Sequence, residues 1–304
     1  MESYTRGPAM TLDTRTTHQV LAATAAKFAD RDALVVRHQK IRNTWSELER
    51  EVERTAQGLI GLGLVPGDRV GVWATNCAEW IYLQLGCARA GLVQVNVNPA
   101  YRVHELAYVL KKSGMKALVL RPADARSDYR SILDEARTGD GIALRHVIYL
   151  DDPTWDEMIA GGAGVDPGVG PSDCQDVVNI QYTSGTTGSP KGVLLTHSNL
   201  LNNGQVIAHG MRFTQADRIC VPVPMYHCFG CVGGTMAAIT TGAAILLPAP
   251  AFDPLATMQS IAEDRATAIY GVPTMFIAQL QHPEFSRFDF SSLRTGVMAG
   301  APCP

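Results

Sequence analysis

A run of hydroxyl-bearing residues, glycines and one lysine lies at positions 183–192 of the 304-residue chain, in the order Thr183-Ser-Gly-Thr-Thr-Gly-Ser-Pro-Lys-Gly192. Glycines let backbone N–H groups approach an anion without obstruction by a Cβ atom, hydroxyls donate hydrogen bonds to phosphate oxygens, and lysine supplies a positive charge. The composition therefore favours a polyphosphate ligand. The alternative is a flexible linker, although linkers rarely follow an apolar segment such as 177–182 directly or end in Pro-Lys-Gly.

The Walker A loop, GxxxxGK[ST], is the nearest rival interpretation of this run. Here Pro190 precedes Lys191 and Gly192 follows it, so no hydroxyl comes after the lysine to hold magnesium. The run is therefore a phosphate-loop candidate of another kind.

A second candidate is the segment Pro222-Val-Pro-Met-Tyr-His-Cys-Phe-Gly230. Taken alone, His227 is better explained as a hydrogen-bonded core histidine than as a catalytic one. Cys228 and Cys231 follow His227 closely, and this group could be taken for a metal or redox site. No second Cys/His pair lies at a suitable spacing, so we do not expect a metal there.

Short β-branched runs alternate with segments of helical spacing from about residue 16, which indicates an α/β fold with a largely buried, mostly parallel sheet. The spacing predicts strands at 33–36, 70–73, 92–97, 117–120 and 177–182. A helix is predicted over 45–60, begun by a capping box of Thr44 and Glu47. The glycines at 61, 63 and 67 miss the dinucleotide fingerprint and predict a helix end and a turn.

Residues 161–172, GGAGVDPGVGPS, are rich in glycine and proline and predict a linker. We therefore expect an N-terminal tail at 1–15, a first α/β subdomain at 16–160, a linker at 161–175 and a second α/β subdomain at 176–304.

Composition narrows the class of protein. The 26 basic and 29 acidic residues give a net charge of −3, which does not suggest a nucleic-acid partner. Seven scattered cysteines and the lack of a readable signal peptide favour a reducing cytoplasm. Residues 219–252 carry no formal charge and are long enough to span a bilayer, but prolines and glycines interrupt them, so we interpret them as buried elements of a soluble core.

The stretch YTSGTTGSPKGVLLTH, residues 182–197, resembles the signature of the AMP-forming adenylating superfamily, the AMP-dependent synthetases and ligases. The resemblance implies that this loop closes over the β- and γ-phosphates of ATP and that Thr183 is the hydroxyl nearest to Mg²⁺. The implied ATP-binding residues of the loop are Thr183, Ser184, Gly185, Thr186, Thr187, Gly188, Ser189, Pro190 and Lys191, with Lys191 also catalytic.

The same resemblance assigns roles to two later segments. It places His227 where the acyl carboxylate meets the α-phosphate, as a hydrogen-bond donor or gate, because a carboxylate nucleophile needs no general base. It places the turn Gly300-Ala301-Pro302 against the adenine. The implied acyl pocket comprises Tyr226, His227, Gly230, Gly233, Gly234, Tyr270, Gly271 and Met275, although the small residues among them are equally well explained by tight helix packing.

The phrases PMYHCFG, YGVPTMF and SSLRTGVMAGAPCP are most similar to the medium-chain acyl-CoA synthetase branch and its bacterial fatty-acid–CoA ligase relatives. The implied fold is the N-terminal large domain of such an enzyme, with stacked, mostly parallel sheets flanked by helices. The implied activity is ATP- and Mg²⁺-dependent activation of a medium- to long-chain fatty acid, followed by thioester formation with CoA. Peripheral membrane association is compatible with a lipid substrate.

The family pattern continues with a magnesium-binding glutamate, a ribose-binding aspartate and a C-terminal lysine that this chain does not contain. We therefore expect the chain to be an N-terminal portion, ending before the barrel subdomain is complete, and to be inactive alone. Two other functions stay open: an acyl-AMP ligase that delivers to a carrier protein, and a non-catalytic nucleotide- or acyl-binding module.

Overall fold

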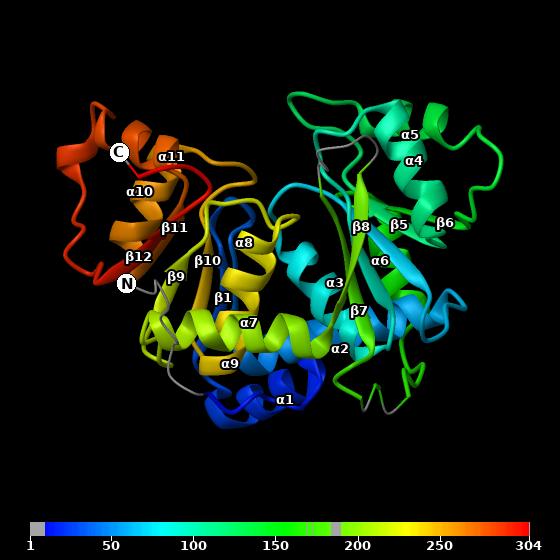
Figure 1. Ribbon diagram of the computed structural model, residues 1–304, viewed down its shortest axis with the longest axis horizontal. Coiled ribbons are helices and arrows are strands. Elements are labelled where there is room, and N and C mark those ends of the chain that lie inside the picture. Colours follow the sequence, from blue (N-terminus) through cyan, green and yellow to red (C-terminus); the bar gives the residue numbers. More distant parts are fainter. Residues whose placement is uncertain (1–9, 169, 172, 184–189, 304) are drawn as a thin grey trace, which may run out of the picture.

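The computed structural model describes residues 10–168, 170–171, 173–183 and 190–303, and builds them around two six-stranded sheets (Figure 1). Sheet A has the order β12-β11-β9-β10-β1-β2 and sheet B the order β6-β5-β3-β4-β7-β8. All strand pairs are parallel except β1–β2 and β7–β8, each of which forms an antiparallel edge. The predicted α/β fold with mostly parallel sheets is thus confirmed.

The strands of sheet A are β1 (Asp32–Val36), β2 (Ile41–Thr44), β9 (Arg218–Cys220), β10 (Ala244–Leu247), β11 (Ala268–Gly271) and β12 (Thr295–Met298). Those of sheet B are β3 (Arg69–Trp73), β4 (Val93–Asn96), β5 (Ala117–Leu120), β6 (His146–Tyr149), β7 (Val177–Thr183) and β8 (Lys191–Thr196). The five predicted strands correspond to β1, β3, β4, β5 and β7. Their fully or mostly buried apolar side chains are typical of strands covered on both faces.

The helices are α1 (Thr17–Phe28), α2 (Trp45–Gly61), α3 (Ala78–Arg89), α4 (Val103–Ser113), α5 (Tyr129–Ala136), α6 (Pro153–Gly161), α7 (His197–Gly210), α8 (Cys228–Gly230), α9 (Ala237–Thr241), α10 (Pro254–Glu263) and α11 (Pro273–Leu280). A π-helical segment, η2 (Cys231–Met236), joins α8 to α9, and η1 (Arg37–Gln39) and η3 (Phe285–Arg287) are 3-10 turns. The predicted capping box of α2 is present: Thr44 Oγ1 accepts from Glu47 N at 3.3 Å and Glu47 Oε2 accepts from Thr44 N at 2.8 Å. The predicted end of that helix is also confirmed, because α2 stops at Gly61 and Gly63 has φ +80°.

A layer of helices lies between the two sheets, with α2, α3, α7 and α9 in the middle of the molecule (Figure 1). The largest hydrophobic cluster joins sheet A residues such as Leu34 and Ile245 to sheet B residues such as Val70 through Trp45 and Trp80 of the intervening helices. A second cluster packs α4 and α5 on the outer face of sheet B, and a third packs α10 on the outer face of sheet A. The sheets are therefore parts of one layered core.

The predicted linker does not separate the two sheets. The strands β1 and β2, which precede it, belong to sheet A, and β7 and β8, which follow it, belong to sheet B. The division into two subdomains at 161–175 stays a prediction. Each sheet contains strands that precede these residues and strands that follow them.

The uncharged stretch 219–252 forms the end of β9, α8, η2, α9 and β10, as a buried part of the core rather than one long helix. Among the described residues, no helix has both the length and the apolar character needed to cross a membrane.

Candidate functional site

The phosphate-loop candidate connects the two antiparallel strands at the edge of sheet B. Thr183, the last residue of β7, is paired with Lys191, the first residue of β8, and both are exposed. Tyr108 in α4 donates a hydrogen bond from its hydroxyl to the carbonyl oxygen of Pro190 at 3.0 Å. The six predicted ligands from Ser184 to Ser189 lie outside the described residues. The strand pair therefore places the two ends of the run, Thr183 and Lys191, side by side.

His227 lies on the segment that leaves β9 of sheet A, and it is the N-cap residue of α8. Its Nδ1 accepts a hydrogen bond from the backbone N–H of Phe229 at 3.1 Å. The side chain is exposed, so the core-histidine interpretation does not apply.

Two neighbours influence the protonation of His227 in opposite directions. The sulfur of Cys228 lies 3.6 Å from Nδ1, which raises the pKa of His227 against the effect of partial burial and lowers the pKa of Cys228. The N–H of Phe229, however, already donates to Nδ1 at shorter range, and a protonated Nδ1 could not accept it. We therefore assign Nδ1 as an acceptor and Nε2–H as the donor of a neutral ring.

The predicted acyl-pocket residues of η2 and β11 lie in direct contact. Tyr270 donates from its hydroxyl to the carbonyl oxygen of Gly233 at 3.0 Å, and its ring stacks on Phe229 with centroids 5.3 Å apart. A Cβ at Gly233 would meet Tyr270 at 3.4 Å, and one at Gly234 would meet Val221 at 3.2 Å. Protein side chains therefore occupy the space beside these two glycines. This favours tight packing over an open acyl channel as the reason for their small size.

Gly230 is the most constrained of the predicted pocket residues. A Cβ there would lie 2.5 Å from the carbonyl oxygen of Pro224 and 2.9 Å from Cα of Met225. Only glycine lets α8 pack this closely on the segment that carries His227.

The predicted adenine turn follows β12, the edge strand of sheet A. Gly300 has φ +88°, and Gly300, Ala301 and Pro302 are exposed. The turn is connected to β11 by a hydrogen bond from Ala299 N to the carbonyl oxygen of Gly271 at 3.2 Å.

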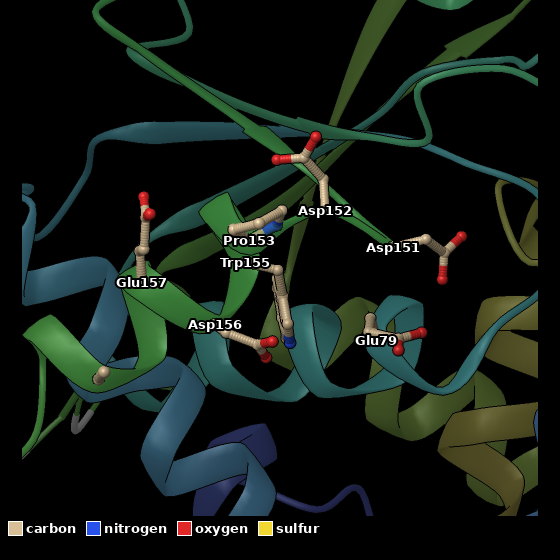
Figure 2. Close-up of a pocket in the computed structure, with 8 residues that line it drawn as sticks. Glu79, Asp151, Asp152, Pro153, Trp155, Asp156 and Glu157 are labelled. Carbon is tan, nitrogen blue, oxygen red and sulfur yellow. The ribbon is translucent and has the colours of Figure 1, made fainter.

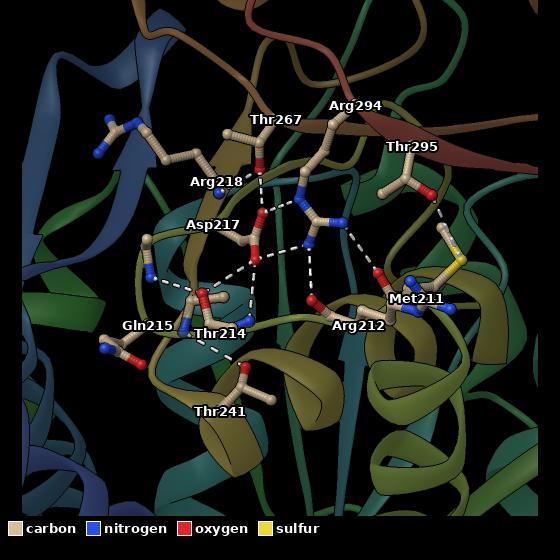
Figure 3. Close-up of polar contacts among 12 residues, drawn as sticks. Met211, Arg212, Thr214, Gln215, Asp217, Arg218, Thr241, Thr267, Arg294 and Thr295 are labelled. Atoms are coloured by element: carbon tan, nitrogen blue, oxygen red, sulfur yellow. Dashed lines mark hydrogen bonds and ion pairs between the residues drawn. The ribbon is translucent and has the colours of Figure 1, made fainter.

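A polar cluster at the start of β12 fixes this strand (Figure 3). Arg294 donates from Nε to Asp217 Oδ1 at 2.8 Å and from Nη2 to Asp217 Oδ2 at 2.7 Å, and it also bonds the carbonyl oxygens of Met211 and Arg212. Asp217 is buried and accepts from Thr267 Oγ1 at 2.6 Å. Burial acts to raise the pKa of Asp217, but the hydrogen bonds from Arg294 and Thr267 outweigh it and lower that pKa.

The candidate segments form a continuous series of contacts. The strand β7 contacts η2 through a hydrogen bond from Gln181 Nε2 to Cys231 Sγ at 3.4 Å, the segment before η2 contacts β11 through Phe229 and Tyr270, and β11 contacts the turn after β12. Thus a series of largely buried contacts connects the end of β7 in sheet B to the turn after β12 in sheet A. Met275, in α11, packs against the same core cluster.

An open acidic hollow of about 670 Å³ lies elsewhere, at the start of α6 (Figure 2). It is lined by Glu79, Asp151, Asp152, Pro153, Trp155, Asp156, Glu157 and Ala160, none of which is a predicted site residue. Asp151 pairs with Arg121 and Asp152 with Arg130, so part of its negative charge is already neutralised.

Sequence motifs missed the buried amides Asn76 and Asn96, which contact the His227 segment from sheet B. The available signal was a polar residue at or just beyond the carboxyl end of an otherwise apolar strand. Ligand sites of parallel sheets form at those ends.

Residues 21–304 match the family described as AMP-binding enzyme. The chain belongs to this family. It is 41% identical over 309 residues to the putative acyl-CoA synthetase YngI of Bacillus subtilis (strain 168), an alignment that covers 94% of this chain and 56% of YngI. It is 39% identical over 333 residues to the mitochondrial medium-chain acyl-CoA ligase ACSF2 of Bos taurus, covering 99% of this chain and 54% of that protein.

The structure of the N-terminal domain of FACL13 from Mycobacterium tuberculosis superposes with a TM-score of 0.82 at 25% identity, covering 95% of this chain and 71% of that one. The expected resemblance to AMP-forming acyl-CoA synthetases, and the expected fold of their N-terminal domain, are thus confirmed. This AMP-binding enzyme chain spans about half the length of the curated relatives it matches.

Proposed function

We propose that this chain supplies the ATP- and acyl-binding part of an enzyme that activates a medium- to long-chain fatty carboxylate as its acyl-adenylate and transfers the acyl group to CoA. One observation carries the proposal: the β7–β8 pair sets Thr183 opposite Lys191 at the two ends of a polyphosphate-like run, in a chain of the AMP-binding enzyme family. The medium-chain ligase among the relatives supports the substrate class.

In the proposed reaction a carboxylate oxygen attacks the α-phosphorus of ATP and pyrophosphate leaves; the CoA thiol then attacks the acyl carbon and AMP leaves. The first step needs positioning and charge neutralisation more than proton transfer. Lys191 would neutralise the phosphates, and Nε2–H of His227 would donate to the reacting carboxylate or α-phosphate. Gly300, Ala301 and Pro302 would contact the adenine, and Tyr270, Gly271 and Met275 the acyl chain.

Magnesium would neutralise phosphate charge when bound, and Thr183 is the residue that we propose to hold it. Its exposed hydroxyl provides the oxygen ligand that Mg²⁺ prefers. The described residues contain no cluster of three or more His, Cys, Asp or Glu side chains that could hold a metal alone. Within this chain, Thr183 would share the ion with the phosphate oxygens of ATP, since Mg²⁺ is commonly bound through substrate phosphates.

The test is ATP–pyrophosphate exchange with a panel of carboxylates from butyrate to stearate. We expect near-background exchange from the 304-residue chain and robust exchange, with a chain-length preference, from a longer protein that contains it. If the longer protein catalyses exchange with none of the carboxylates in the panel, the non-catalytic binding module would be favoured. Robust exchange by the 304-residue chain would contradict its expected inactivity.

The acyl acceptor is decided by a separate measurement. Thioester formation is assayed with CoA and with an acyl carrier protein as alternative acceptors. We expect CoA to be the preferred acceptor. Preference for the carrier protein would indicate an acyl-AMP ligase instead of an acyl-CoA ligase. A cytoplasmic location, with peripheral membrane contact for a lipid substrate, belongs to the same proposal.

A further inference from the structure

The segment that carries His227 starts in sheet A but is held by side chains of sheet B. Asn76, just after β3, donates from Nδ2 to the carbonyl oxygen of Val223 at 3.0 Å and accepts from the N–H of Met225 at 2.8 Å. Its amide thus pairs with the main chain on both sides of Pro224. Asn76 is 2% exposed, so these bonds form away from water.

A second amide holds the next residue of the segment. Asn96, the last residue of β4 and 3% exposed, donates from Nδ2 to the carbonyl oxygen of Tyr226 at 3.0 Å, and the same nitrogen lies 3.6 Å from Cys231 Sγ. These contacts flank His227 on both sides, at the residue before it and at the start of η2.

The other end of the Asn96 amide is connected to β7, the strand that ends at Thr183. Oδ1 of Asn96 accepts from Asn179 Nδ2 at 2.9 Å and from Gln94 Nε2 at 3.1 Å. Asn179 and Gln181 are two residues apart and therefore point to the same face of β7, and Gln181 donates to Cys231 Sγ. Hydrogen bonds thus run from β7 through Asn96 to the main chain next to His227.

This network is not explained by stability alone. Buried amides are costly unless every polar atom is bonded, and among the described residues Asn179 Oδ1 and Gln94 Oε1 have no hydrogen-bond partner. Apolar residues at such positions would pack the interior at less cost. Features of this kind are expected where a site must be held in one geometry.

We propose that Asn96 and Asn179 are positioning residues that couple the phosphate-binding strand β7 to the His227 segment. Binding of polyphosphate at the end of β7 is then transmitted to residues 226–231 through the Asn96 amide. The chemical consequence of this coupling rests on the proposed adenylation function, whereas the coupling itself is measurable without turnover.

Cysteine alkylation in the 304-residue chain tests the structural half of the proposal. Cys231 is buried and contacts the Asn96 amide, whereas Cys228 is exposed beside His227. Iodoacetamide labelling, resolved by mass spectrometry, therefore reports the accessibility of the buried and the exposed face of the segment separately. Asn96→Asp keeps the Oδ1 acceptor but removes the donor to Tyr226, and Asn96→Ala removes both. We expect either variant to accelerate Cys231 labelling by about tenfold, because the lost hydrogen bonds increase local opening.

The matched control is Asn202→Ala. Asn202 is also a buried asparagine with several hydrogen bonds, but its hydrogen-bond partners are Asp13 and Ser198 rather than residues of the His227 segment. We expect its Cys231 labelling to stay within about twofold of the unsubstituted chain once global opening is allowed for. Unchanged Cys231 labelling in Asn96→Asp, or equal acceleration in Asn202→Ala, would overturn the proposal.

The coupling half is tested by adding Mg·ATP. In the unsubstituted chain we expect ATP to slow Cys228 labelling by about threefold, and in Asn96→Asp we expect this protection to be lost while the Kd for ATP changes by less than about threefold. Protection that persists in Asn96→Asp would mean that ATP merely shields the thiol, and the coupling would be rejected. If ATP does not bind at all, the proposed function fails, and Cys231 labelling still decides whether Asn96 holds the segment.

Discussion

The two sheets present their candidate functional residues in different ways. In sheet B, Thr183 and Lys191 lie exposed at the ends of a strand pair, held by backbone pairing and by a side-chain contact from Tyr108 to Pro190. In sheet A, both candidate segments are fixed by buried side chains: the His227 segment by amides of sheet B, and the start of β12 by Asp217, which holds the partly exposed Arg294. One sheet thus presents the proposed phosphate contacts on exposed strand ends, while the other holds His227 and the proposed adenine turn through buried groups.

The largest expected effect is on the stability of sheet A. Arg294→Met removes the partner of Asp217, whose side chain is 5% exposed, and should lower the free energy of unfolding by about 3 kcal/mol because a carboxylate is left buried without its cation. Urea denaturation measures it. Arg287→Met breaks an exposed pair with Glu284 and should cost less than about 0.5 kcal/mol. Equal losses of unfolding free energy in the two variants would contradict the view that the Asp217–Arg294 pair stabilises sheet A.

Lys191→Ala probes the exposed end of sheet B. We expect ATP binding to weaken by about 100-fold, because a charge-assisted contact to phosphate is lost, with little change in thermal stability. Calorimetric titration with Mg·ATP is the measurement, and fatty-acid binding should be preserved. Lys112→Ala, also an exposed lysine, should leave both affinities unchanged; equal losses of ATP and fatty-acid binding by Lys191→Ala would argue against its phosphate role.

Gly230→Ala tests the rigidity of the His227 segment directly. The new methyl group would overlap the backbone at Pro224, so we expect a loss of about 2 kcal/mol in unfolding free energy and faster labelling of Cys231. Gly210, the last residue of α7, has nothing within 4 Å of an added Cβ, so Gly210→Ala should be neutral or slightly stabilising. A neutral Gly230→Ala would show that the segment can shift freely.

The smallest effect concerns the far end of β8, where His197 begins α7. Its Nδ1 accepts from Thr17 N at 3.1 Å, and burial lowers the pKa of His197 to about 4. Because this pKa is lower in the folded than in the unfolded chain, the stabilisation is complete above about pH 6.5 and is lost as pH falls towards 4.

Between pH 7 and pH 5 this one group should cost between about 1 and 2 kcal/mol. His38, whose pKa burial also lowers to about 4, acts in the same direction. His197→Asn should therefore reduce, but not abolish, the fall in stability measured by urea denaturation at the two pH values. An unchanged pH dependence would show that His197 is protonated as easily in the folded chain as in the unfolded one.

Local patterns predicted much of the fold. The five strands and the cap of α2 follow from apolar runs and from Thr44 and Glu47, which act over a few residues. Strand partners did not follow, because buried parallel strands such as β1 and β4 look alike in sequence and pair over long distances. The exchange of strands between the sheets across 161–175 therefore had no local signal.

For the candidate site, as for the fold, the sequence predicted local features but not the long-range contacts. Motifs identified the residues proposed to touch ligands, such as Lys191 and His227. They did not identify Asn76 or Asn96, since an isolated asparagine near a strand end has many explanations until its partner is known. Nor could they show that Tyr270 and Phe229 fill the space beside Gly233.

The order in which the chain builds its sheets has a consequence for folding. Along the chain, β1 and β2 of sheet A come first, all six strands of sheet B follow, and β9 to β12 of sheet A come last. A nascent chain that ends before residue 218 would therefore expose the edge of β1 that pairs with β10, because β10 has not yet been made. Cleavage within 161–175 would leave each piece with an incomplete sheet, so the two halves should fold only together, and slowly, because their decisive pairings are distant in sequence.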